Sequence, residues 1–480
     1  MNEIVAADGA RLSAMISSRA VSCREVMIAF LDRIDSVNPA VNAIVALQSR
    51  ESLLAQADER DRQLARGESC GWMHGFPLAV KDLAQTAGIV TTLGSPIFRN
   101  HIPAVDSLVV ERMKRAGAIV IGKTNTPEFG LGSNTYNPVY GTTRNPYDPA
   151  FSAGGSSGGA AVALALRMLP VADGSDMGGS LRNPAGWNNV FGFRPSFGRV
   201  PKFLEFDLFV QQLGVEGPMA RTAADLARLL AIQAGFDVRS PLSLDSDPSV
   251  FTEPLDSPAR GIRIGWLGSL NGHLALESGV LEVCEDALQT LTGIGCIVEP
   301  ANLGFDPERL WGAWRALRSM LAGGTLSAQY SVPERRALLK PEAIWEIENG
   351  RSLTAFDIYR ASVARSDWYR AALSLFDRYD ILALPSAQLF PFNLSAHWPA
   401  SIAGRSMDTY HRWMEVVVPA TMAGLPAASV PAGFGGERGL PLGLQLIGPP
   451  RGDRSVLRLA QAYDLASDWV RRAPPPEPSH

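Results

Sequence analysis

The chain has 480 residues, 46% of them hydrophobic and 19% charged, and its formal net charge is −4. This composition is ordinary for a globular enzyme, and the length allows a large core without disulfides or metal ions. Basic residues are scattered, which argues against a nucleic-acid-binding surface. No apolar run reaches the length of a membrane span, and the N-terminus lacks the pattern of a signal peptide.

The cysteines and histidines show no metal-binding spacing. The four cysteines, Cys23, Cys70, Cys284 and Cys296, are far apart, which fits a reducing compartment. None of the six histidines forms a paired metal motif. We therefore expect a cytoplasmic protein without a metal site.

The first half of the chain alternates predicted helices with short buried strands. Ser22 and Glu25 form a capping box that starts a helix. Further helices are predicted over 51–66, 107–115 and 157–168, and strands over 76–80, 118–122 and 169–172. This alternation predicts an α/β fold with a central, mixed and twisted sheet covered by helices on both faces.

The segment from about 240 to 405 differs, because it is rich in proline, serine and charge and contains a cluster of tryptophans. We interpret it as a variable region that covers a core formed by about 60–235 and 380–470. Core strands return at 381–385, 426–430 and 441–447, and a last helix is predicted over 454–466. The expected organisation is a single domain over 1–473 and a disordered tail over 474–480.

The most informative segment is the Gly/Ser-rich stretch over 152–182. Ser156 and Ser180 each follow a Gly-Gly pair. Glycines let backbone N–H groups approach a substrate closely, as an exposed nucleophile beside an oxyanion site requires. A flexible linker is the alternative. It fits poorly, because the glycines adjoin apolar segments rather than a polar tract.

Upstream, Lys81 ends the apolar run Phe76–Val80. Burial there would lower the pKa of its amine from about 10.4 towards neutrality, as a general base needs. A surface lysine paired with Asp82 is the alternative.

Together these motifs resemble the amidase signature family. Lys81, Gly154–Gly159 and Asp176–Ser180 carry the resemblance, and the blocks 75–82, 122–129 and 439–445 support it. The resemblance spans nearly the whole chain and is weakest over 240–405. The sequence Trp187-Asn188-Asn189 is more similar to bacterial stand-alone amidases, including the 6-aminohexanoate cyclic-dimer hydrolases, than to glutamyl-tRNA amidotransferase A subunits.

The resemblance implies a Ser-Ser-Lys triad, in which Ser180 is the nucleophile, Ser156 the bridging serine and Lys81 the base. It also implies a cis Gly155–Ser156 peptide and an oxyanion hole formed by backbone N–H groups of Met177, Gly178, Gly179 and Ser180. Gly130 matches a position that lines the substrate site. Asp176 and Arg182 are expected to hold the loop by hydrogen bonds and an ion pair.

We expect an apolar, partly aromatic pocket formed by 129–134, by Trp187, and by side chains of the region 306–345 such as Trp311 or Trp314. The alternative is that these tryptophans simply pack in the core.

The resemblance implies an amide hydrolase that forms an acyl-enzyme without metal or cofactor. The expected partner is a small-molecule amide, with no nucleic acid and no membrane, and a homodimer is left open. One rival is the A subunit of a glutamyl-tRNA amidotransferase, which releases ammonia from glutamine for a partner. Another is an inactive binding protein, which the intact Lys81, Ser156 and Ser180 argue against.

Overall fold

The structure, a computed structural model, describes residues 2–204 and 207–477, and its central element is an eight-stranded sheet. In spatial order the strands are β10 (Ile297–Pro300), β9 (Arg263–Trp266), β11 (Ile381–Pro385), β15 (Leu440–Ile447), β14 (Ala427–Gly435), β7 (Phe191–Arg194), β8 (Val215–Ala220) and β6 (Val171–Asp176). The first three strands run parallel, whereas each pairing from β11 to β6 is antiparallel. The predicted α/β fold with a mixed sheet flanked by helices is confirmed.

A smaller sheet holds the lysine of the predicted site. It consists of β1 (Ile44–Val45), β3 (Ile119–Thr124) and β2 (Pro77–Lys81), and every residue of β2 is buried. The pairing of β2 with β3 is parallel and places Lys81 opposite Thr124. Because β2 also packs against β6, Lys81 lies beside the strand that leads to Ser180.

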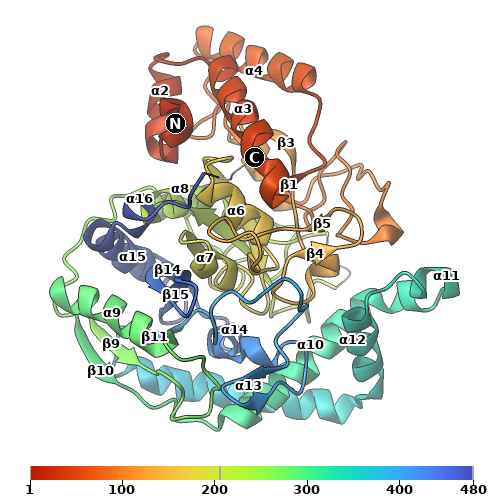
Figure 1. The fold of residues 1–480 in the computed structure, drawn as a ribbon, viewed down its shortest axis with the longest axis vertical. Coiled ribbons are helices and arrows are strands. Elements are labelled where there is room, and N and C mark those ends of the chain that lie inside the picture. Colours follow the sequence, from red (N-terminus) through yellow and green to blue (C-terminus); the bar gives the residue numbers. More distant parts are fainter. Residues whose placement is uncertain (1, 205–206, 478–480) are drawn as a thin grey trace.

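Twelve of the helices surround these sheets (Figure 1). They are α1 (Glu3–Ala6), α2 (Gly9–Ser17), α3 (Cys23–Val41), α4 (Arg50–Ala65), α5 (Leu108–Arg115), α6 (Gly158–Ala165), α7 (Asn183–Trp187), α8 (Ala223–Gln233), α9 (Val280–Gly293), α14 (Val418–Met422), α15 (Asp453–Ser467) and α16 (Trp469–Arg472). The predicted capping box is present at α3, where the side chains of Ser22 and Glu25 each accept the other's backbone N–H. Over residues 2–204 and 207–477, no helix has the length and apolar character needed to cross a membrane.

The remaining helices run along the bottom of the molecule in Figure 1 and extend to its right side. They are α10 (Pro307–Tyr330), α11 (Pro333–Arg336), α12 (Pro341–Ser352) and α13 (Ala355–Phe376). These helices belong to the segment 240–405, which was expected only to cover the core. The segment also supplies β9 and β10, the last two strands at one edge of the main sheet.

The minor elements within 2–204 and 207–477 are four short strands and four turns of 3₁₀ helix. The strands are β4 (Tyr136–Asn137), β5 (Gly141–Thr142), β12 (Ser401–Ile402) and β13 (Arg405–Ser406), and the 3₁₀ turns are Pro96–Phe98, Glu128–Gly130, Pro248–Phe251 and Arg412–Val417. Residues 474–477 lie outside any helix or strand, and the rest of the predicted tail, 478–480, lies outside the described residues.

Two predicted strands are longer than their apolar sequences indicated. The strand predicted at 118–122 is β3 and continues to Thr124, and the one predicted at 169–172 is β6 and continues to Asp176. The polar end of β6 pairs with β8 in unbroken register, Asp176 opposite Val215. Backbone pairing therefore extends each strand into the segment that carries the site.

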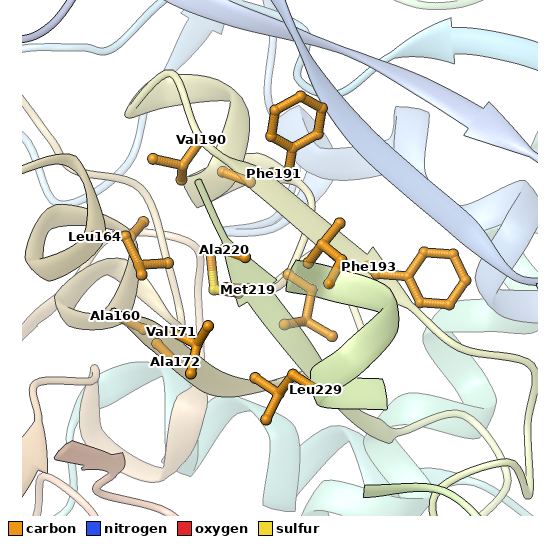
Figure 2. Close-up of a cluster of buried hydrophobic side chains, with 14 of the residues drawn as sticks. Ala160, Leu164, Val171, Ala172, Val190, Phe191, Phe193, Met219, Ala220 and Leu229 are labelled. Atoms are coloured by element: carbon orange, nitrogen blue, oxygen red, sulfur yellow. The ribbon is translucent and has the colours of Figure 1, made fainter. Parts of the chain in front are cut away.

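Buried apolar side chains fill the space between α6 and the β6–β8–β7 end of the main sheet. Figure 2 shows Leu164 of α6 close to Val171 of β6, with Met219 of β8 and Phe193 of β7 beyond them. All eight residues of α6 are buried, and the helix starts directly after the first Gly-Gly-Ser motif. The core thus fixes the N-terminus of α6, and with it the loop that carries Ser156.

Gly192 in β7 provides a test of this packing. A Cβ atom at Gly192 would lie 1.9 Å from the Leu181 carbonyl oxygen and 2.9 Å from the Cβ of Ala185. Gly192→Ala should therefore destabilise the protein by about 3 kcal/mol, because backbone must move to relieve the overlap. Thermal unfolding should show a clearly lower Tm.

The matched control is Gly312→Ala in α10, where a Cβ would have no neighbour within 4 Å. It should leave the Tm unchanged or raise it, because alanine favours a helix by about 1 kcal/mol over glycine. Equal Tm values for the two variants would contradict the packing described for Gly192.

Candidate active site

Lys81 is buried at the end of β2, with 1% of its surface exposed, and its amine is surrounded by hydroxyl groups. The Nζ atom lies 2.8 Å from the Oγ of Ser156, 2.8 Å from the Oγ of Ser157 and 3.0 Å from the Oγ of Ser175. These partners are neutral, so none of them compensates a positive charge on the amine.

Burial accordingly lowers the pKa of Lys81 to about 7, and the nearby carboxylates of Asp173 and Asp176 oppose this shift only in part. At neutral pH a large fraction of the amine is unprotonated and able to accept a proton. The predicted effect of burial on Lys81 is present in the structure.

Ser156 lies in a loop held by hydrogen bonds to its backbone. The hydroxyls of Ser133 and Thr135 donate to the carbonyls of Gly155 and Gly154, respectively. The Gly155–Ser156 peptide is cis, as expected. Gly130 lies directly across from this serine, because a Cβ there would be 3.4 Å from the Ser156 Oγ.

Ser180 lies in a tight turn after β6 that is folded around the carboxylate of Asp176. That carboxylate accepts hydrogen bonds from the backbone N–H groups of Gly179 and Leu181, both at 3.1 Å. Gly179 has a φ of +86°, which a side chain would strain, and a Cβ there would lie 2.8 Å from Val417. The turn leaves Ser180 7% exposed, on the wall of a cavity.

Two buried arginines hold Asp176. Arg182 donates to it through Nε at 3.0 Å and through a terminal nitrogen at 2.9 Å, and Arg194 approaches at 3.2 Å. Burial alone would raise the pKa of Asp176, but the two guanidinium groups hold it well below its usual range. The ion pair expected between Asp176 and Arg182 is present, and Arg194 completes it.

The cavity has a volume of about 300 Å³ and brings the three predicted triad residues to one wall. Its wall includes Lys81, Gly130, Ser156, Asp176, Met177, Gly178 and Ser180. The rest of the wall is mainly apolar and includes Leu83, Ala84, Leu93, Leu108, Phe129, Leu131, Phe203, Leu204, Val215, Ala322, Leu326 and Met414. Among the described residues, the charged side chains on the wall besides Lys81 and Asp176 are Asp173, Lys202, Glu216 and Arg318.

The prediction that tryptophans line this pocket is wrong for the described residues. Trp187 is completely buried, stacks on Trp413 with a centroid distance of 5.7 Å, and donates to the Leu389 carbonyl. Trp311 and Trp314 stack on each other at 5.0 Å. Neighbouring aromatic rings cover the faces of all three tryptophans, which therefore pack in the core beside the cavity. The alternative interpretation, that these tryptophans pack in the core, is correct.

The segment 129–134 divides between the cavity and its support. Its first four residues, through Gly132, line the cavity. Ser133 instead binds the Gly155 carbonyl, and the side chain of Asn134 accepts a hydrogen bond from Ser152.

Sequence reasoning missed several polar residues of the site: Ser157, Ser175, Arg194 and Arg318. Ser157 and Ser175 bind the lysine amine, and Ser157 could have been found because it adjoins the first motif. Arg194 was recognisable as a charge at the end of an apolar strand. Arg318 follows Trp311 and Trp314 at helical spacing and was recognisable as a charge within an apolar stripe.

Comparison with known proteins identifies the family. The model of the Amidase family matches residues 25–457, and the chain belongs to this family. It is 34% identical to an acylamidase of Rhodococcus erythropolis over 471 residues, 96% of each chain. It is also 32% identical to the A subunit of a glutamyl-tRNA(Gln) amidotransferase from Dehalococcoides mccartyi over 499 residues, 99% of this chain and 100% of that one.

Among solved structures, a bacterial aryl acylamidase of the amidase signature family matches with a TM-score of 0.91 and 30% identity, covering 98% of this chain and 99% of that one. The predicted family is therefore confirmed. The chain is an amide hydrolase that acts on small amides.

The buried Asp176 gives a prediction that separates its charge from its shape. Asp176→Asn keeps the shape but leaves Arg182 and Arg194 without a counter-charge, which should cost about 3–5 kcal/mol of stability. Thermal unfolding should show a large drop in Tm, together with loss of amide hydrolysis.

The control is Asp367→Asn, because Asp367 also bridges two arginines, Arg309 and Arg370, but does so at the surface. Its Tm should change little, since exposed ion pairs contribute little to stability. A comparable drop in both variants would show that burial is not the cause.

Proposed function

We propose that the chain hydrolyses amides through an acyl-enzyme on Ser180, with Ser156 as proton relay and Lys81 as base. One observation carries this proposal: a buried amine with a pKa of about 7 lies 2.8 Å from the Ser156 hydroxyl, in the wall of the cavity that also holds Ser180. A hydroxyl can donate and accept at once, which a relay requires.

The reaction then proceeds in two stages, acylation of Ser180 and hydrolysis of the acyl-enzyme. The Ser180 Oγ attacks the carbonyl carbon, its proton moves to the Ser156 Oγ, and the proton of Ser156 moves to the Lys81 amine. The C–N bond breaks as a proton returns by the same route to the leaving nitrogen. Water repeats the sequence at the acyl carbon, releases the carboxylic acid and restores Ser180.

The negative charge on the carbonyl oxygen needs backbone donors that are free to bind it. The Gly179 N–H already donates to Asp176 at 3.1 Å. The proposed oxyanion donors are therefore the N–H groups of Met177, Gly178 and Ser180, a narrower set than the resemblance implies.

The proposed substrates are amides with one aromatic ring on the acyl group. The cavity of about 300 Å³ is near the lower end of the range for small-molecule sites and has a mainly apolar wall that includes Phe129 and Leu326. The name of one relative, an aryl acylamidase, agrees with an aromatic substrate, and the choice of the acyl group as the site of the ring is part of the proposal.

The alternative is the ammonia-releasing component of an amidotransferase, which the 32% identity to one such protein keeps open. Glutamine carries a carboxylate and an ammonium group, and both would lose water wherever they meet the mainly apolar wall. The cavity thus favours a simple amide.

The deciding experiment measures ammonia release by the isolated chain. Benzamide should be hydrolysed with a higher kcat/KM than glutamine or acetamide. Ser180→Ala should release no ammonia and should lose labelling by a fluorophosphonate probe. Activity restricted to glutamine would favour the amidotransferase component, and a label mapped to Ser156 in the variant would contradict the assigned nucleophile.

The pKa of Lys81 predicts how the rate depends on pH. Only the neutral amine accepts a proton, so kcat/KM for benzamide should rise through an ionisation near pH 7 and level off above it. Lys81→Met should lower kcat/KM by about a thousandfold or more. The partly exposed Lys114, changed to Met, is the control and should keep the wild-type profile. A flat wild-type profile between pH 6 and 9 would overturn the role of Lys81.

The same shift predicts a pH-dependent stability. The unfolded chain keeps the lysine protonated up to about pH 10.4, whereas the folded chain releases this proton near pH 7. Because the unfolded state binds more protons between these values, Lys81 contributes a stability that rises with pH there. Lys81→Met should remove this contribution, which thermal unfolding at pH 7 and pH 9.5 measures independently of activity.

A further inference from the structure

Arg318 is a charged side chain in the cavity wall, and one of its three guanidinium nitrogens has no oxygen acceptor among the described residues. It lies on α10 with 6% of its side chain exposed. Its Nε donates to Glu346 at 2.7 Å, and Nη2 donates to the Tyr410 hydroxyl at 3.0 Å. Its other terminal nitrogen, Nη1, has one hydrogen-bond partner among the described residues, the sulfur of Met177 at 3.3 Å.

The partners of Arg318 fix its orientation and balance its charge. Glu346 is itself held in place, because it also accepts from the Tyr410 hydroxyl at 2.6 Å and from the Ser319 hydroxyl at 2.7 Å. The ring of Trp314 lies under the guanidinium group at 5.3 Å. The charge pair is therefore complete, and the side chain cannot turn away to satisfy Nη1.

Nη1 carries two N–H groups, and a thioether sulfur is a weak acceptor. The next turns of the same helix present Ala322 and Leu326 to the same cavity. An apolar substrate would fill this space but would remove water from Nη1 without replacing its hydrogen bond. A substrate with an acceptor at this point would replace it.

We propose that Arg318 is a specificity-determining residue whose Nη1 binds a neutral carbonyl on the substrate, away from the amide that is cleaved. This inference rests on the proposed function and names the class of substrate: aromatic amides with a second carbonyl on the ring. The acceptor is neutral rather than anionic because Glu346 already balances the guanidinium charge. Two further acidic side chains, Asp173 and Glu216, line the cavity together with one further basic side chain, Lys202, so the wall does not favour a second anion.

The test compares two ligands of similar shape, 4-acetylbenzamide and 4-isopropylbenzamide, of which only the first has the acceptor. Binding is measured by calorimetry on Ser180→Ala, so that no chemistry is needed. The acetyl compound should bind at least tenfold more tightly, which corresponds to about 1.4 kcal/mol. It should also bind more tightly than 4-carboxybenzamide.

Arg318→Lys in the same background keeps the positive charge beside Glu346 but removes the second terminal nitrogen. The preference for the acetyl compound should fall to within about twofold, as expected when one hydrogen bond is lost. The control is Arg315→Lys on the same helix, whose partly exposed side chain approaches Asp408 at 3.9 Å and should leave the preference unchanged. Met177→Leu, which removes the competing sulfur, should increase the preference and serves if Arg318→Lys does not fold.

Equal binding of the two ligands to Ser180→Ala would overturn the inference, and so would an unchanged preference in Arg318→Lys or tighter binding of the carboxylate. These outcomes are independent of the proposed reaction. An acetyl preference that depends on Arg318, in a protein that fails to hydrolyse either compound, would support the binding role and reject the catalytic one.

Discussion

An amine taken out of water and bonded to neutral hydroxyls releases its proton far more readily than one in solvent, and the site depends on keeping Lys81 in that state. The apolar β2 strand buries the amine, and parallel pairing with β3 holds the strand in place. The carboxylate of Asp173 accepts the backbone N–H of Lys81 instead of its amine. A carboxylate bonded directly to Nζ would stabilise the ammonium form and remove the base.

The arrangement around Asp176 extends this control of charge to the nucleophile. Two buried guanidinium groups face one carboxylate, so the turn beneath Ser180 carries an excess of positive charge. Burial lowers the pKa of Arg194 to about 10, which still leaves it protonated at neutral pH. This excess favours the negative charge that develops on a carbonyl oxygen during attack. The neutral form of Lys81 comes instead from burial, which Asp176 opposes. One ion-pair network thus shapes the turn and sets its electrostatic potential.

The parts of the site that the sequence predicted are those determined by local backbone demands. Gly-Gly-Ser motifs and an apolar strand ending in lysine carry their structural requirements within a few residues, so Lys81, Ser156 and Ser180 were recognisable. The opposite wall depends on which face of a distant helix meets the cavity. One stripe of α10 carries Trp311, Trp314 and Arg318. The tryptophans pack in the core, whereas the arginine reaches the cavity, and the aromatic composition of the segment did not predict this difference. Strands β9 and β10 were missed for a similar reason, because β9 joins the sheet through pairing with the distant β11, and β10 joins it through pairing with β9.

Met177 connects the two walls. It belongs to the turn that leads to Ser180, yet its sulfur lies against Arg318 on α10. Asp176 and its two arginines hold the side of the cavity that carries Ser180. Glu346 and Tyr410 hold the opposite side, which carries Arg318 of α10. Among the described residues, these two hydrogen-bond networks have no side chain in common. A change in α10 can therefore alter which amide fits without breaking a hydrogen bond of Lys81, and Met177 is one contact through which such a change reaches the turn of Ser180. This separation lets binding preference and reactivity vary independently on one fold.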